Sequence, residues 1–191
     1  GTLVVTLMSE GRVVALPDTN RDNKADSTID ILTGLDNPHG VLFRCDENGN
    51  DCRMYVAEED VVQSYEYNPE TFTATLPKTL ASLPQGGSHS TRTLLQHPDG
   101  KRLLISVGSS CNVCVEEDAR RAKILVMNFS DDAFDELTEF TRGLRNTVFM
   151  AIHPVTGEIW GTDMGRDLLG DDTPPDEINI ITEGGNFGWP N

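Results

Sequence analysis

The stretch GLDNPHGVLFRCDENGNDCRMYVAEED, residues 34–60, is the first of three similar modules that decide the fold. The second is GSHSTRTLLQHPDGKRLLISVGSS at residues 87–110, and the third is GLRNTVFMAIHPVTGEIWGTDMGRD at residues 143–167. Each module has a polar start, an apolar strand, a tight turn rich in Asp, Asn or Gly, and a second strand that leads into a loop. Two of the turns share the pair His-Pro, at His97 and His153.

The spacing of these modules predicts the architecture. Helical periodicity is almost absent, and a period of about 50 residues built from short strands is typical of β-propeller blades. Strands are expected at residues 2–8, 11–16, 53–59, 61–67, 102–108, 123–129 and 157–163. We therefore predict an all-β protein, a single partial β-propeller domain over residues 1–191. Its blade-like modules lie near 1–33, 34–86, 87–142 and 143–191.

The number of modules is small for a closed ring. Closed propellers typically have four to eight blades, and 191 residues make three to four. The start of the chain, GTLVVTLMSEGRVVALPD at residues 1–18, is also abrupt and reads as the middle of a blade. We expect a fragment of a longer ring, or a half-ring that a second copy completes. A β-sandwich is the alternative, but sandwich turns recur without such module identity.

The charge of the chain excludes some partners. There are 31 acidic and 15 basic residues, which gives a net charge of −16. This charge repels nucleic acid and anionic membrane surfaces. No apolar run reaches the roughly 20 residues of a membrane helix. No signal peptide is visible, and an exported protein that begins at Gly1 would have lost one.

The four cysteines form two close pairs, Cys45 with Cys52 and Cys111 with Cys114. Close pairs of this kind favour two short disulfides in an exported protein. A zinc site built from both pairs is the alternative, but the spacing between the pairs is not that of a zinc ribbon. Redox catalysis by the C-x-x-C pair is disfavoured, because no βαβ pattern surrounds it.

Aligning the modules on their shared turn brings dissimilar polar residues into register. One position holds Asp36, His89 and Arg145, and the next holds Asn37, Ser90 and Asn146. Equivalent residues of different blades converge at one end of a propeller axis, so we predict a pocket there. His97 and His153 lie in the turns at the opposite end, and we predict that both are structural.

Several motifs resemble one family. GGSHSTRTLL, VGSSCNVCVEED, GLRN, TDMGRDLLGDDTPPDEINII and GGNFGWPN occur in the same order as in the glucose/sorbosone dehydrogenases that depend on pyrroloquinoline quinone (PQQ). The resemblance covers residues 34–191 and, weakly, the segment before them. It implies a six-bladed β-propeller that holds the quinone in its axial pocket, with parts of the ring outside this chain.

The resemblance also assigns roles to residues. It makes His89 of SHSTRT the catalytic base, although Ser88 stands where many family members have an Asp that could orient the imidazole. It makes Arg145 and Asn146 ligands of the quinone. A guanidinium suits a cofactor with three carboxylates, because it offers a bidentate fork.

The calcium of the family is implied at the loop after the third module. There, main-chain carbonyls of Gly165 and Arg166 would be its ligands, and the cation would polarise the quinone carbonyl. Met164 replaces a polar amide that sugar-specific members often have. The remaining acidic residues of the loop are predicted to cap it or to bind a second calcium: Asp171, Asp172, Asp176 and Glu177.

A second acidic stretch, DTNRDNKAD, spaces oxygen ligands in a way that resembles a calcium loop. The candidate ligands are Asp18, Asn20, Asp22 and Asp26. Asn23 and Ile29 replace the Gly and Glu of an EF-hand. A structural calcium site and a solvated hairpin turn both remain open.

Together these observations predict a quinoprotein dehydrogenase, periplasmic or secreted, that oxidises a sugar, polyol or related alcohol or aldehyde. His89 would take the hydroxyl proton while hydride passes to PQQ in the presence of Ca²⁺. The electron acceptor is not indicated. One alternative is a non-catalytic propeller that binds carbohydrate or protein. Another is a calcium-dependent lactonase, for which Asp36 alone supplies too few carboxylates.

Overall fold

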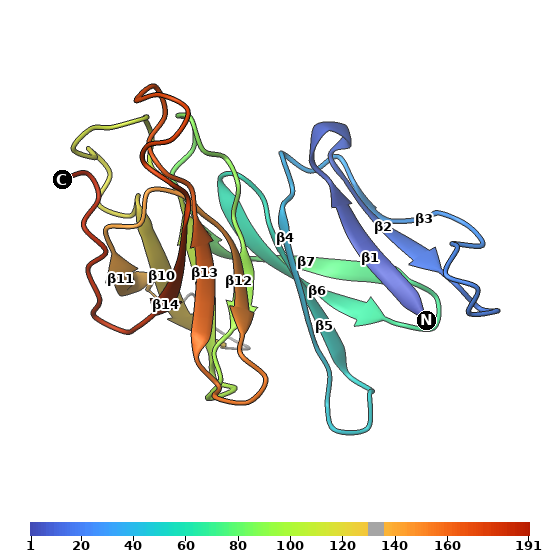
Figure 1. Cartoon of the computed structure of the whole chain (residues 1–191). Coiled ribbons are helices and arrows are strands. Elements are labelled where there is room, and N and C mark those ends of the chain that lie inside the picture. Colours follow the sequence, from blue (N-terminus) through green and yellow to red (C-terminus); the bar gives the residue numbers. More distant parts are fainter. Residues whose placement is uncertain (130–135) are drawn as a thin grey trace.

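The computed structural model describes residues 1–129 and 136–191 and consists of four antiparallel β-sheets, A to D, with one 3₁₀-helix at Met8–Glu10 (Figure 1). Sheet A contains β1 (Thr2–Leu7), β2 (Arg12–Pro17) and β3 (Ile29–Thr33), and sheet B contains β4 (Gly40–Arg44), β5 (Cys52–Ala57), β6 (Val61–Asn68) and β7 (Thr73–Ser82). Sheet C contains β8 (Leu94–Gln96), β9 (Arg102–Val107), β10 (Lys123–Asn128) and β11 (Thr138–Arg142), and sheet D contains β12 (Thr147–Ile152), β13 (Ile159–Asp163) and β14 (Glu177–Ile181).

Within each sheet the strands pair in chain order, so each sheet is a meander of hairpins. The first strands of the four sheets, β1, β4, β8 and β12, contact one another in succession. Side chains reinforce this inner row: Thr6 donates a hydrogen bond to the carbonyl of His39, at 3.0 Å, and Thr93 donates one to the carbonyl of Val148. The inner strands therefore lie side by side, as they do around the axis of a propeller.

Alternation along the middle strands explains how the sheets stack. Successive side chains of a strand point to opposite faces, and β9 has buried residues on both. Leu103 and Ile105 pack with sheet B, whereas Leu104 packs with sheet D. On β5, Tyr55 packs towards sheet C and Val56 towards sheet A. Sheets B and C are thus each covered on both faces, which is the packing of consecutive propeller blades.

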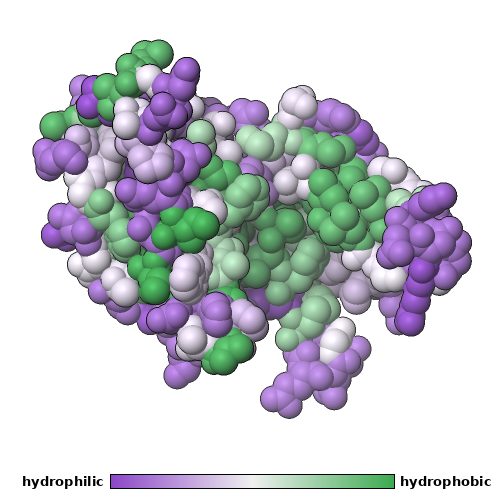
Figure 2. All heavy atoms as spheres, viewed as in Figure 1, coloured by the Kyte–Doolittle hydropathy of each residue, from purple (hydrophilic) through white to green (hydrophobic). Residues whose placement is uncertain are grey.

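The two end sheets differ, because each has a single neighbour among the residues that the structure describes. Leu3 of sheet A is 64 % exposed, and Phe149 and Ile178 of sheet D are 63 % and 70 % exposed. Apolar residues also gather in the hollow beside sheet A (Figure 2). These uncovered apolar faces are the surfaces on which further sheets of a ring would pack.

These observations confirm the all-β architecture, with strands in each of the seven predicted segments. One disulfide joins Cys45, directly after β4, to Cys52, the first residue of β5, and so closes the β4–β5 turn. The other joins Cys111 to Cys114 in the β9–β10 loop. The prediction of disulfides in preference to a zinc site is therefore confirmed. Among the described residues, no helix has the length and apolar character required to cross a membrane.

Candidate active site

Four loops meet at one end of sheets B, C and D. They are residues 83–93 before β8, 108–122 after β9, 143–146 before β12 and 164–176 after β13. Main-chain hydrogen bonds join them: Ser88 N–H donates to Ser110 O at 2.8 Å, Ser109 N–H to Arg145 O at 2.8 Å, and Met164 N–H to Asn146 O at 3.2 Å. The predicted site residues of two separate modules, 87–142 and 143–191, are therefore held on one rim.

His89 is half-buried, and its orientation is fixed. Its Nδ1 lies 2.9 Å from the carbonyl oxygen of Ser109 and 3.0 Å from Ser109 Oγ. Ser109 Oγ–H donates to Cys111 O at 2.8 Å, so both Ser109 oxygens act as acceptors towards the imidazole. Nδ1 must therefore carry the proton, and Nε2 keeps the lone pair. No residue that the structure describes bonds to Nε2.

The surroundings of His89 also set its charge. Burial lowers the pKa of the imidazole, and the positive charge of Arg145 lowers it further. The hydrogen bond to Ser109 and the charges of Asp167 and Glu116 act in the opposite direction without reversing the shift. His89 is therefore neutral at pH 7 and has the protonation state of a general base. Ser109, not Ser88, supplies the orienting contact.

Arg145 lies beside this histidine, but most of its donors are already used. Its side chain is only 3 % exposed. Nε donates to Asn112 O at 3.0 Å, Nη1 to Met164 O at 3.3 Å, and Nη2 to Asn112 Oδ1 at 3.0 Å and Asp167 Oδ2 at 2.8 Å. A guanidinium has five N–H donors, so a single one on Nη1 is left. The expected bidentate fork is thus not available to a ligand in this conformation.

Asn146 and the start of β12 are anchored by a buried carboxylate that the sequence did not single out. Asp163 accepts from the main-chain N–H groups of Arg145 and Asn146, at 2.9 and 2.8 Å, and from Thr147 Oγ1 at 3.1 Å. Burial raises the pKa of Asp163, while these three hydrogen bonds oppose the rise. Asp163 therefore fixes the backbone on which Arg145 is carried.

Gly108 allows the two predicted site residues to approach. A Cβ atom at this position would lie 2.5 Å from Asn146 Oδ1 and 2.7 Å from His89 Cβ. Neither distance is possible between real atoms, so any side chain at residue 108 would force the two loops apart. The glycine after the end of β9 is therefore required by packing at the site.

The third residue in register, Asp36, lies beside the same rim but makes different contacts. Asp36 Oδ2 accepts from Gln85 Nε2 at 3.2 Å, and Oδ1 accepts from Asn37 Nδ2 at 3.1 Å. Gln85 belongs to the loop that carries His89. The structure thus brings His89 and Arg145 together, whereas Asp36 reaches only the edge of the His89 loop.

Two buried arginines hold that loop. Arg92 is fully buried and donates only to main-chain carbonyls, namely those of Glu59, His89, Thr91 and Pro84, at 2.7 to 3.0 Å. Arg121 donates to the carbonyls of Gln85 and Gly86, at 2.9 and 2.5 Å. Burial, and then the charge of Arg121, lower the pKa of Arg92 to about 10. Arg92 remains charged at neutral pH and fixes the backbone of His89.

The predicted calcium loop lies directly beside Arg145. Gly165 N–H donates to Asp176 Oδ1 at 2.9 Å, so Asp176 caps the loop as expected. Within the described residues, one group of three His, Cys, Asp or Glu side chains is close enough to share a metal, and it is Cys111, Cys114 and Glu116. Its cysteines are joined in the disulfide. Three side-chain ligands for a cation are thus not gathered at this rim within the described residues, and the assignment of the Gly165 and Arg166 carbonyls stays a prediction.

The residues present fit the reacting edge of a quinone cofactor. The rim offers a neutral base with a free Nε2, one guanidinium N–H and a loop of main-chain carbonyls. It offers few free cations for three carboxylates, since Arg145 is largely occupied. Arg166 is exposed on the same loop.

The acidic stretch at 18–26 lies in the β2–β3 connection, in a different sheet from the site. The carboxylate of Asp18 accepts from the N–H groups of Asp22 and Asn23, at 3.1 and 3.0 Å. Asp26 accepts from Thr19 N–H and Oγ–H, at 2.8 and 2.5 Å, and these bonds lower its pKa. The side chains thus close the turn on its own backbone. A role for Asn20 or the three aspartates as metal ligands stays a prediction.

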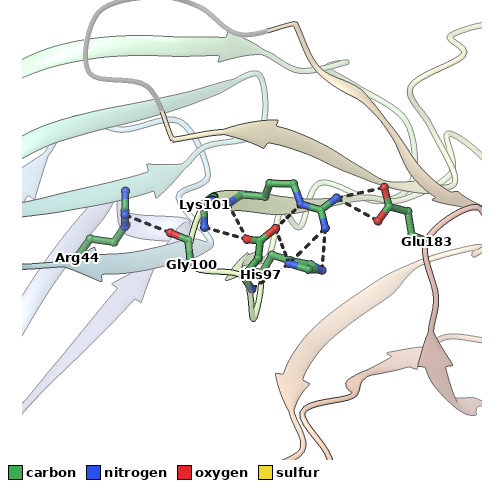
Figure 3. Close-up of polar contacts among 7 residues, drawn as sticks. Arg44, His97, Gly100, Lys101 and Glu183 are labelled. Atoms are coloured by element: carbon green, nitrogen blue, oxygen red, sulfur yellow. Dashed lines mark hydrogen bonds and ion pairs between the residues drawn. The ribbon is translucent and has the colours of Figure 1, made fainter.

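The two turn histidines lie at the opposite end, as expected. Nδ1 of His97 accepts from Asp99 N–H at 3.2 Å, and Nδ1 of His153 accepts from Thr156 N–H at 3.1 Å. His97 also belongs to a polar network with Arg102 and Glu183 (Figure 3). Both imidazoles therefore stabilise turns.

Sequence reasoning did not identify Ser109, Asn112, Asp163 and Asp167 as site residues. Their importance comes from contacts between loops that are far apart in the chain, which no local pattern reports. One signal was available: Asn112 lies inside the C-x-x-C segment, and that segment was interpreted only for its cysteines.

A family model described as TrAA12-like matches residues 1–184. The calcium structure of Trichoderma reesei Carbohydrate-Active Enzymes Family AA12 superposes with a TM-score of 0.81 and 23 % identity, covering 100 % of this chain and 53 % of that one. The holo form of the pyranose dehydrogenase PQQ domain from Coprinopsis cinerea gives a TM-score of 0.78 and 22 % identity, covering 96 % and 48 %. These likenesses establish the β-propeller fold.

Among curated proteins, quinoprotein glucose dehydrogenase B of Acinetobacter calcoaceticus is 24 % identical over 185 residues. The alignment covers 81 % of this chain and 37 % of that protein. The chain therefore spans just over a third of this relative and about half of the two solved structures.

Proposed function

Because this chain belongs to the TrAA12-like family, we propose that it is the site-bearing part of a quinoprotein oxidoreductase that oxidises a sugar, polyol or related alcohol or aldehyde. The observation that carries the proposal is the state of His89. Its Nδ1–H is fixed on Ser109, its Nε2 is free, and burial keeps it neutral. A base in this state, beside a guanidinium on the rim of a propeller, suits proton removal from a hydroxyl.

The chain's own residues have defined tasks in this proposal. Nε2 of His89 accepts the proton of the substrate hydroxyl, and Ser109 holds the ring in the required tautomer. The one remaining Nη1–H of Arg145 and the amide of Asn146 orient the cofactor, and the carbonyls of Gly165 and Arg166 hold Ca²⁺. When bound, PQQ with Ca²⁺ supplies the electron-accepting carbonyl.

The location and the partners follow from the same chemistry. The two disulfides favour an oxidising compartment, and we propose that the protein is periplasmic or secreted. We expect a small-molecule substrate, as in the proposed dehydrogenase, and the net charge of −16 disfavours nucleic acid as a partner. The solved relatives are about twice as long, so we expect the rest of the cofactor pocket to come from further chain or from a second copy.

Reconstitution tests this proposal. The longest gene product that contains these residues is mixed with PQQ and Ca²⁺, and dye reduction is followed with aldoses, polyols and simple alcohols. We expect bound-quinone absorbance and Ca²⁺-dependent turnover, both lost on chelation. Tight quinone binding without turnover on any of these substrates would refute the dehydrogenase. Absence of quinone binding together with carbohydrate binding would favour a non-catalytic module.

A further inference from the structure

We propose that the disulfide-closed loop Cys111–Cys114 is the positioning element of the site, and that Asn112 is the residue through which it acts. The inference rests on the proposed function for its catalytic consequence, but its structural part stands on hydrogen bonds alone. The loop is short, because its two cysteines are three positions apart in the sequence. It bonds Arg145 directly through Asn112, and it supports His89 indirectly, because Cys111 O accepts from the Ser109 hydroxyl that faces the imidazole.

Asn112 joins Arg145 to the loop after β13. Its carbonyl accepts from Arg145 Nε, and its side-chain Oδ1 accepts from both Arg145 Nη2, at 3.0 Å, and Asp167 N–H, at 2.8 Å. Its Nδ2 donates to Asp167 O at 3.0 Å. The side chain therefore satisfies a guanidinium and a peptide group at once, and an apolar residue of similar size could replace none of its three side-chain bonds.

The same loop also fixes the histidine. Ser109, whose two oxygens face His89 Nδ1, donates from its hydroxyl to Cys111 O at 2.8 Å. Ser109 N–H donates to Arg145 O. Residues 109–112 are thus the common support of the base and of the guanidinium, and within the described part of the chain these two groups do not hydrogen-bond to each other.

The disulfide gives this support its rigidity. Residues 111–114 contain no regular secondary structure, so their conformation depends on the bridge and on the bonds of Asn112. Glu116 adds one more attachment, because Oε1 accepts from Ser110 N–H at 2.8 Å. Opening the bridge would free the acceptors of Arg145 and of Ser109 Oγ–H together. Both site residues would then lose their fixed positions without any change in their identity.

The experiment uses imidazole ¹⁵N spectra and amide exchange, with the His89 signals assigned through His89→Gln. In the wild-type protein we expect the Nδ1–H tautomer at His89 and slow exchange of the Asp167 amide. In the double variant Cys111→Ser, Cys114→Ser we expect a tautomer mixture, because Nε2–H is favoured in water. We also expect faster Asp167 exchange. The matched control is Cys45→Ser with Cys52→Ser, which removes the other disulfide and should leave both readouts unchanged.

Single variants separate the role of Asn112 from that of the bridge. Asn112→Ala should accelerate Asp167 exchange and lower turnover of the quinone-loaded protein about tenfold to a hundredfold, the usual effect of losing a supporting contact. Asn112→Asp keeps the oxygen that accepts from Asp167 N–H but loses the Nδ2 donor to Asp167 O, so Asp167 exchange should be slower than in Asn112→Ala and faster than in the wild type. If the double cysteine variant does not fold, Asn112→Ala, which keeps the Cys111–Cys114 disulfide, tests the proposal by itself. Unchanged Asp167 exchange in Asn112→Ala, or loss of the His89 tautomer in the Cys45/Cys52 control as well, would overturn the proposal.

Discussion

The two ends of sheets C and D carry similar residues in very different settings. At the candidate site, His89 and Arg145 lie among buried groups and bond mainly to the backbone and to Asn112. At the other end, His97, Asp99, Arg102 and Glu183 form a surface network (Figure 3). The side chains of Asp99 and Glu183 there are 33 % and 62 % exposed. Residue type alone therefore does not distinguish a positioned base from a turn.

Burial is the property that separates the two ends, because it decides what a hydrogen bond contributes. When a buried charged donor is removed, the groups that accepted its hydrogen bonds lose their partner and cannot bond to water instead. An exposed ion pair is replaced by solvent at little cost. The predictions below use matched substitutions at the two ends to measure this difference.

The largest expected effect is on turnover. His89→Ala should lower dehydrogenase activity of the reconstituted protein by about 10²- to 10⁴-fold, the range for loss of a general base. Quinone affinity should stay within about tenfold, since the imidazole faces the substrate proton. His97→Ala is the control and should keep full activity. The assay is dye reduction at saturating quinone, with affinity from absorbance titration. Lost affinity with unchanged turnover per bound quinone would contradict the role of His89.

The next effect is on stability. Arg92→Met should lower the free energy of unfolding by about 3 kcal/mol, because four main-chain carbonyls lose their shared donor in a buried site. Arg102→Met at the opposite end should cost less than about 1 kcal/mol. Urea unfolding followed by fluorescence of the two tryptophans measures both. Equal losses for the two variants would show that burial does not separate the ends.

The pH dependence gives a third contrast. The pKa of His89 is lowered by burial. At a pH between the folded and the unfolded pKa, the imidazole of the unfolded chain therefore binds a proton that the folded chain does not bind. Stability from this group is complete above about 6.5, the unfolded pKa, and falls as the pH drops towards the folded pKa. The acid limb of turnover should likewise lie below 6.5, as proton NMR titration of His89 can check.

The opposite end should respond in a lower pH range. The hydrogen bond from Lys101 N–H, followed by Arg102 and His97, lowers the pKa of Asp99. Its contribution is present above about 3.9, the unfolded pKa, and is lost as the pH falls through the folded pKa. His89→Gln should flatten the stability profile near pH 6, and Asp99→Asn should flatten it only below pH 4. A His89→Gln profile identical to wild type near pH 6 would contradict the assigned shift.

The fold could be predicted because its signals are local and repeated. Hairpin turns at His97 and His153 mark equivalent strands, and an apolar run such as Leu103 to Ile105 indicates a strand covered on both faces. The direction of each side chain could not be read in such a run, because every position is apolar. The stacking of sheet C between sheets B and D resolves it, with Leu103 and Leu104 on opposite faces.

The candidate site could be predicted only in part. The register of the modules placed His89 and Arg145 at one rim, since equivalent positions of stacked sheets converge. It could not show that Arg145 is occupied by Asn112 and Asp167, because loops of different lengths supply those acceptors. Nor could it show that Ser109 takes the orienting role expected of a residue before His89.

The smallest expected effect concerns the edge of the surface network. Glu183 receives both of its bonds from Arg102 Nη1, at 3.1 Å, and is largely exposed. Glu183→Gln should change the free energy of unfolding by less than about 1 kcal/mol at low salt, and by less still at 1 M salt, where the Debye length is about 3 Å. Asp167→Asn is the counterpart at the site, because Asp167 is also exposed but bonds a buried guanidinium. Its effect on unfolding should persist in high salt, since Arg145 Nη2 would face a weaker, uncharged acceptor away from water. Urea unfolding at both salt concentrations measures the two variants. Equal salt sensitivity would mean that the exposure of the carboxylate, rather than the burial of its partner, sets the strength of an ion pair in this protein.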